Sequence, residues 1–163
     1  MSGQELFVLF ELAGFTCAVP ARSVARLETV DEAELRQSAV PAGAPLALLG
    51  RVQVGGETFA AWDLGALLQV PAASNAWVAL RLEGAAGPVP VALRTGRCIG
   101  VTPVRPTMQL VSALFRARGQ AFRGAFQVAV AGEAEQRVAV LLDPASLLDA
   151  TELELSKQAA EVR

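Results

Sequence analysis

Short segments in which hydrophobic and polar residues alternate recur along the chain, separated by turns that contain glycine. Residues 5–12 form a largely apolar segment of strand length, a turn follows at Gly14, and a second short apolar segment ends at Pro20. Because successive side chains of a strand point to opposite faces, this arrangement predicts a β-hairpin. Segments of strand length dominate the chain, so the pattern predicts an all-β fold built from small barrels.

The same hairpin pattern is written twice. When the sequence is shifted by seventy positions, residues 7–12 fall on residues 77–82. The matching positions in the turn and second strand are Gly14 with Gly84, Val19 with Val89, and Pro20 with Pro90. Two ordered blocks of this kind indicate an internal repeat.

The ends of the two repeats match at a shift of eighty, where residues 59–68 fall on residues 139–148. In each, a strand is followed by an aspartate, and a Leu-Leu pair comes four and five residues later. Asp63 and Asp143 are therefore predicted to cap one helical turn each. The leucine pairs, which end at Leu68 and Leu148, are predicted to tuck that turn against the sheet.

These repeats predict one domain, residues 1–163, that holds two barrels of similar topology. The first barrel is expected at about 5–70 and the second at about 75–150, with residues 72–75 between them. Residues 149–163 are expected to form a C-terminal tail or short helix. Each repeat is small for an independent core, so the two barrels are expected to pack together.

The two repeats differ between their matching ends, and two of the three segments there are ambiguous. Residues 31–37 fit either a helical turn or a solvated loop, and Leu46–Val54 fits a strand interrupted at Gly50. Residues 107–115 carry apolar side chains at helical spacing, which fits either a helix or a mixed loop over the second barrel.

The composition argues against catalysis. The chain has 163 residues, 53% of them hydrophobic, and contains neither histidine nor tyrosine. The commonest general base, the commonest neutral metal ligand and every Ser-His or Cys-His pair are therefore excluded. We predict no enzyme activity, no cofactor and no metal site.

Charge and hydropathy bear on partners and location. The net charge is −2, which argues against nucleic acid as a partner of the whole chain. Between Gly84 and Gly132 there are six arginines and no acid, which fits either a solvated face or a patch for an acidic partner; they are Arg94, Arg97, Arg105, Arg116, Arg118 and Arg123. No apolar run is long enough to span a membrane, no signal peptide is recognisable, and the two cysteines are too few for a disulfide framework, so a cytoplasmic location is expected.

The order and spacing of several blocks resemble the CheW-like family of bacterial chemotaxis adaptors. The blocks are residues 12–20, Val24–Leu27, residues 45–56, residues 61–64, Phe122–Gly124 and residues 139–143. The resemblance covers about Leu6 to Leu148. It implies two packed five-stranded SH3-like barrels with a groove between them, short helical turns and a C-terminal helix.

The resemblance also implies a function. CheW-like adaptors are non-catalytic scaffolds of two-component chemosensory signal transduction, and they link the cytoplasmic tip of a chemoreceptor (methyl-accepting chemotaxis protein) to the regulatory domain of a CheA-type histidine kinase. The membrane would be reached only through the receptors. The alternatives are a divergent paralogue that binds only receptor or only kinase and, from another class, a double-barrel module that binds a small ligand or nucleic acid.

Candidate contact residues follow from the same resemblance. The receptor-groove candidates are Val24, Arg26, Leu27, Gly50, Val52, Val54 and Gly55, and the kinase-facing candidates are Trp77, Val89 and Val91. The chain departs from the family at Arg26, where the family often has glutamate, and at Gly55, where it usually has arginine. The opposite-charge pair that the family places beside the groove is therefore not expected here. Arg94 likewise stands where an acid is typical.

Overall fold

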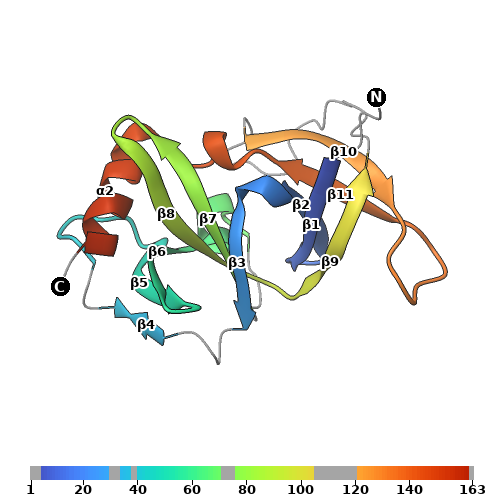
Figure 1. Ribbon diagram of the computed structural model, residues 1–163, viewed down its shortest axis with the longest axis horizontal. Helices are drawn as coiled ribbons and strands as arrows, with labels where there is room; N and C mark the ends of the chain where they lie inside the picture. Colours follow the sequence, from blue (N-terminus) through green and yellow to red (C-terminus); the bar gives the residue numbers. More distant parts are fainter. Residues whose placement is uncertain (1–4, 30–33, 38–39, 71–75, 105–120, 162–163) are drawn as a thin grey trace.

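The computed structural model describes residues 5–29, 34–37, 40–70, 76–104 and 121–161 (Figure 1). Eleven strands are assigned in this part of the chain: β1 (Glu5–Leu12), β2 (Phe15–Pro20), β3 (Val24–Thr29), β4 (Glu34–Arg36), β5 (Leu48–Val54), β6 (Glu57–Asp63), β7 (Ala76–Gly84), β8 (Gly87–Thr95), β9 (Cys98–Val104), β10 (Phe122–Val128) and β11 (Arg137–Leu142). The short helical elements are η1 (Ala21–Ser23), α1 (Leu64–Leu68) and η4 (Pro144–Ser146), and the C-terminal helix is α2 (Ala150–Glu161). The all-β prediction is confirmed.

The strands form two sheets, and each sheet draws strands from both halves of the chain. One sheet has the order β10-β11-β2-β1-β9, and the other has the order β3-β7-β8-β6-β5-β4. The first hairpin therefore belongs to the sheet completed by C-terminal strands, and the β7–β8 hairpin belongs to the sheet completed by N-terminal strands. The expected division into barrels at about 5–70 and about 75–150 is wrong, because the repeats exchange their hairpins.

Two parallel pairings make this exchange. Strand β11 lies parallel to β2, and β6 lies parallel to β8. A sequence repeat shows which segments of the two halves are equivalent. It does not show whether a strand pairs within its own half or with the other half, so aligning the two repeats does not reveal the exchange. The second hairpin is also longer: Leu12 pairs with Phe15, whereas Leu82 pairs with Val89. The match of Pro20 with Pro90 is thus displaced by four residues in the structure.

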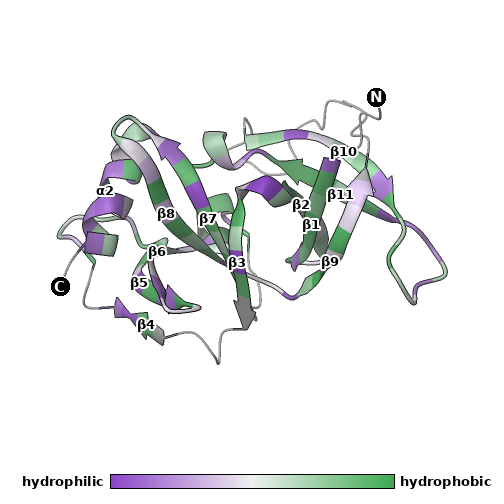
Figure 2. Cartoon of the chain, viewed as in Figure 1, coloured by the Kyte–Doolittle hydropathy of each residue, from purple (hydrophilic) through white to green (hydrophobic). Residues whose placement is uncertain are grey.

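Buried side chains form three clusters, because both faces of each sheet carry apolar residues. A central core holds one face of both sheets together and includes Phe10, Val19, Trp62 and Leu80. A second cluster, with Phe7, lies on the other face of the five-stranded sheet, and a third, with Trp77, lies on the other face of the six-stranded sheet. Strands β3 and β5 of the six-stranded sheet contact each other although three strands separate them, so that sheet curls over its cluster. Figure 2 shows the hydrophobic colouring along β1 and β8.

The two predicted aspartate caps are confirmed. The backbone N–H of Ala66 donates to Asp63 Oδ1 at 3.2 Å, and that of Ala145 donates to Asp143 Oδ1 at 3.1 Å. The leucines that follow are buried, with exposures of 1% for Leu68 and 4% for Leu148. Each cap therefore starts a short turn whose leucines close one end of the central core.

Helix α2 is fixed at its start and in its middle. The N–H of Glu152 donates to Asp149 Oδ1 at 2.8 Å, and the N–H of Asp149 donates to Glu152 Oε1 at 3.0 Å, which is a reciprocal capping box. One turn later, Trp62 Nε1 donates to the buried Ser156 Oγ at 2.8 Å. This bond anchors the helix on β6, where Figure 1 shows α2 beside β6 and β8.

The two sheets carry equivalent ion pairs of opposite polarity. Arg81 on β7 pairs with Glu57 on β6 at 2.5 Å, and Glu11 on β1 pairs with Arg137 on β11 at 3.2 Å. The repeat shifts of seventy and eighty place residue 81 on residue 11 and residue 137 on residue 57. Each pair joins the exchanged hairpin of one half to a strand of the other half.

The carboxylate of Glu11 gives the protein a testable acid sensitivity. The hydrogen bond from Arg97, and then that from Arg137, holds the pKa of Glu11 below its usual range. A lowered folded-state pKa stabilises the fold above the unfolded pKa of about 4.3, and this stabilisation is lost as pH falls further.

We expect Glu11→Gln to remove a small part, below about 1 kcal/mol, of the stability difference between pH 7 and pH 3, since the pair is partly exposed. Urea unfolding at pH 7, 5, 4 and 3 measures this difference. Equal pH profiles for wild type and Glu11→Gln, with Glu135→Gln as the exposed control, would contradict it.

Some sequence expectations fall elsewhere. Residues 34–36 form an edge strand, not the helical turn or loop expected there, because they pair with residues 51–53 of β5. The predicted interruption of Leu46–Val54 is confirmed as a register shift between Leu48 and Gly50. The segment 107–115 and the linker 72–75 lie outside the described residues.

Candidate partner-binding surface

The ten predicted contact residues separate sharply by exposure. Arg26, Leu27 and Gly55 are exposed, and Val24 is partly buried. The buried ones are Gly50, Val52, Val54, Trp77, Val89 and Val91. The structure thus gathers Val24, Arg26 and Leu27 on β3, places Gly55 near Arg26, and removes the other six from the surface.

All three kinase-facing candidates are wrong as surface contacts. Trp77 is 1% exposed within the cluster on the curled face of the six-stranded sheet, where Val52 and Val54 also lie. Val89 and Val91 face the central core instead. The alternation of side chains along a strand shows which residues share a face. It does not show that both faces of this curled sheet are buried.

Gly50 is enclosed by the chain itself. Its φ is +132°, which disfavours other residues, and an added Cβ would collide with the carbonyl oxygen of Arg36 on β4. The missing side chain therefore admits the neighbouring edge strand, not a partner. The expectation of a partner contact at Gly50 is wrong for this reason.

Arg26 and Gly55 do meet, as the resemblance implied for their positions. A Cβ at Gly55 would lie 2.5 Å from Cδ and 2.7 Å from Nε of Arg26, so the arginine side chain lies across the glycine. Arg26 Nε donates to Glu57 Oε1 at 3.4 Å, and Glu57 also binds Arg81. Arg26 therefore forms its ion pair with Glu57. In the family pattern, by contrast, a glutamate at the position of Arg26 faces an arginine at the position of Gly55.

Sequence reasoning missed Glu57 and Arg81. Both occupy polar positions at the ends of otherwise apolar alternating segments, at residues 57–63 and 76–82. They share one face of the sheet with Arg26, because Arg26 pairs with Ala79 and Val54 pairs with Glu57. The cluster Arg26–Glu57–Arg81 thus forms one exposed, net positive site beside Gly55.

Exposed apolar side chains lie at an edge strand of each sheet. Leu27 on β3 is 41% exposed, and Val101 on β9 is 55% exposed. Leu27 pairs with Val78, and Val101 pairs with Val8, both members of the central core. At these two edge strands, the sheet face that packs in the central core is therefore exposed to solvent, and a partner could cover it.

The arginine-rich region does not form a free positive patch where the structure describes it. Arg97 pairs with Glu11, and Arg123 binds Asp143 at 2.7 Å. The guanidinium of Arg94 stacks over the Trp77 ring at 5.8 Å. Arg105, Arg116 and Arg118 lie outside the described residues.

Titratable chemistry is sparse in the described ranges. There, no group of three or more histidine, cysteine, aspartate or glutamate side chains could hold a metal ion, and no helix is both long and apolar enough to cross a membrane. Burial raises the pKa of the Cys17 thiol to about 12, so this thiol is unreactive near neutral pH. The exposed apolar side chains at the edge strands and the Arg26–Glu57–Arg81 cluster are features that suit protein contacts.

Comparison with known proteins identifies the fold. No protein-family model matches the sequence, and no curated protein matches it significantly. Among solved structures, the chain is similar to the scaffolding protein TtCheW from Thermoanaerobacter tengcongensis, with a TM-score of 0.70 and 11% sequence identity. The match covers 91% of this chain and 92% of that one. The chain therefore has a CheW-like fold.

Proposed function

We propose that this protein is a non-catalytic adaptor of a chemosensory pathway in the bacterial cytoplasm, linking the cytoplasmic tip of a chemoreceptor to the regulatory domain of a CheA-type histidine kinase. The observation that carries the proposal is the likeness to a scaffolding protein over nearly the full length of both chains. A fold can host several functions, so the surface must also suit the role.

The exposed part of the predicted receptor groove supports the receptor contact. Leu27 offers an apolar side chain on one face of the edge strand β3, and Arg26, on the other face of that strand, lies in a cluster with Glu57 and Arg81. A receptor tip that lies along this strand edge, with an apolar side chain toward Leu27 and a carboxylate toward Arg26, would match this surface. The partner residue that faces Arg26 would be negatively charged, whereas a family member with glutamate at this position would face a positively charged partner residue.

A divergent adaptor that makes only one of the two contacts is the second candidate. Two observations favour it: the charge reversal at Arg26, and the burial of Trp77, Val89 and Val91, which leaves the kinase contact without its proposed residues. A module that binds nucleic acid is less well supported, because Arg97 and Arg123 are already paired with acids.

The charge reversal leads to a binding prediction. We expect the wild type to bind at most one of two standard partners tightly, namely a receptor-tip peptide dimer and a kinase regulatory domain from an unrelated species. Arg26→Glu with Gly55→Arg should tighten binding to these partners about tenfold or more, because like charges across an interface are costly. The two changes belong together, since a longer side chain at residue 55 would displace Arg26.

Titration calorimetry against each partner measures the effect. Arg97→Glu with Gly132→Arg changes charge identically at exposed sites away from this cluster and serves as the control. Tight binding of the wild type to both partners, unaltered by the substitutions at 26 and 55, would show that these residues have drifted neutrally.

A further inference from the structure

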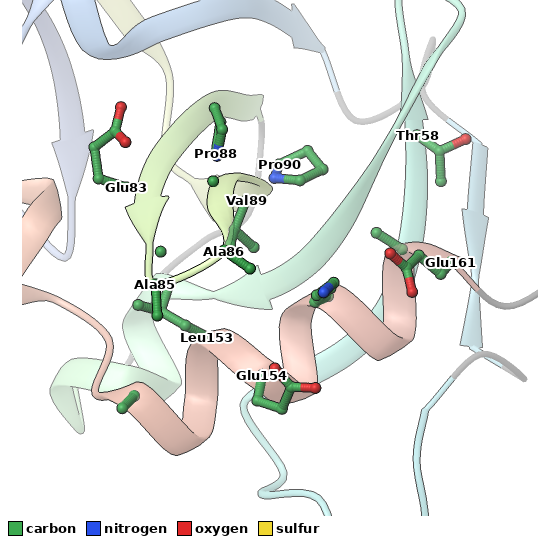
Figure 3. A pocket seen from close by; sticks show the side chains of 15 residues that line it. Thr58, Glu83, Ala85, Ala86, Pro88, Val89, Pro90, Leu153, Glu154 and Glu161 are labelled. Atoms are coloured by element: carbon green, nitrogen blue, oxygen red, sulfur yellow. The ribbon is translucent and has the colours of Figure 1, made fainter.

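A cleft of about 340 Å³ separates helix α2 from the turn of the β7–β8 hairpin, and neither Leu27 nor Arg26 lines it (Figure 3). Six of its fifteen lining residues are alanine or glycine: Gly84, Ala85, Ala86, Gly87, Ala150 and Ala160. Small side chains on both walls keep the cleft open, because neither wall can reach across it. Its volume lies within the range of clefts that hold a small ligand or a few side chains.

The floor of this α2 cleft is apolar. Val89 and Pro90 contribute from the hairpin, and Leu153 contributes from the helix. Figure 3 shows Ala85, Ala86 and Val89 of the hairpin lying over α2 near Leu153. The capping box and the Trp62–Ser156 bond hold the helix in place, so the cleft is preformed.

The rim of the α2 cleft is acidic. Glu83 lies on the hairpin, while Glu154 and Glu161 lie on the helix, three residues before and four after Lys157, which places them on one side of the helix. Three carboxylates against one ammonium leave the rim with a charge of −2. Within the described residues none of these four side chains forms an ion pair, so the carboxylates are available to a partner.

We propose that the α2 cleft is a second docking surface, which takes a short segment of a partner protein carrying one or two apolar side chains next to arginine or lysine. The apolar side chains would enter between Val89 and Leu153, and the basic ones would pair with the rim glutamates. Of the ten contact residues predicted from the resemblance, the proposal uses only Val89, which forms part of the buried floor of the cleft and is not an exposed contact. An acidic segment or an anionic small molecule is the wrong occupant for this rim.

A random twelve-residue peptide library displayed on phage tests the proposal. The library is selected on wild type and counter-selected on Glu154→Lys with Glu161→Lys. Both positions are exposed, so the variant should unfold at the wild-type temperature. We expect the selected peptides to combine apolar with basic residues, and to bind the double variant at least tenfold more weakly than wild type. Glu133→Lys with Glu135→Lys carries the same change of charge in the β10–β11 loop as a control, and it should bind like wild type.

A second readout locates the peptide. Amide chemical shifts of Ala85, Ala86 and Ala160 should move on titration, and Ala86→Trp, which fills the cleft, should abolish those shifts. Selected peptides without basic residues, equal binding to both variants, or shifts confined to β3 would each overturn the proposal, as would a selection that yields no peptide specific to wild type.

Discussion

Replacing Gly50 with alanine is expected to destabilise the protein by about 3 kcal/mol or more. The backbone at Gly50 has a φ of +132°, and strain of this kind costs about 1–3 kcal/mol in other residues. The new methyl group would also collide with the Arg36 carbonyl, and overpacking typically adds about 1–3 kcal/mol. Strand β4 would have to move off β5. Urea unfolding monitored by tryptophan fluorescence measures the loss.

Gly56→Ala is the matched control for Gly50→Ala. Gly56 has a φ of +83°, and nothing lies within 4 Å of an added Cβ, so this change isolates the backbone cost of about 1–2 kcal/mol. Equal losses for the two variants would mean that β4 does not press on Gly50, and the enclosed position assigned to it would be wrong.

The leucine pairs after the two aspartate caps should contribute to the central core in similar measure. Leu68 and Leu148 are buried in the same cluster, so truncation of either to alanine is expected to cost about 2–5 kcal/mol. Leu46→Ala is the control, because Leu46 is 97% exposed and its loss should change stability by less than about 0.5 kcal/mol. Thermal unfolding midpoints for the three variants measure the costs. Unchanged unfolding in both Leu68→Ala and Leu148→Ala would show that the turns do not pack on the core.

Much of the local structure could be read from the sequence because it depends on neighbouring residues. The first hairpin, the caps at Asp63 and Asp143 and the break at Gly50 all follow from alternation, capping chemistry and glycine's lack of a side chain. The exchange of hairpins between the sheets could not be read in this way. It depends on the pairing of β2 with β11 and of β6 with β8, which brings together residues far apart in the chain.

The candidate site shows the same limit. Arg26, Leu27 and Gly55 are exposed as a partner surface requires, and Arg26 lies across Gly55. Trp77 and Val52, which have the same alternating pattern around them, lie inside the curled sheet. Arg26 and Leu27 lie on the edge strand β3 and Gly55 lies in the β5–β6 turn, whereas Trp77 and Val52 lie on internal strands of that sheet. Glu57 could have been found from the repeat, since it stands at the position equivalent to Arg137 and forms the equivalent ion pair.

Sedimentation velocity tests the central claim most directly. The three components are this chain, a soluble fragment of a chemoreceptor tip and the regulatory domain of a CheA-type kinase, both partners encoded in the same genome as the chain. The account predicts one species that contains all three components, and predicts that receptor fragment and kinase domain sediment separately when the chain is left out. Receptor fragment and kinase domain that still sediment separately when the chain is present would contradict the linking role.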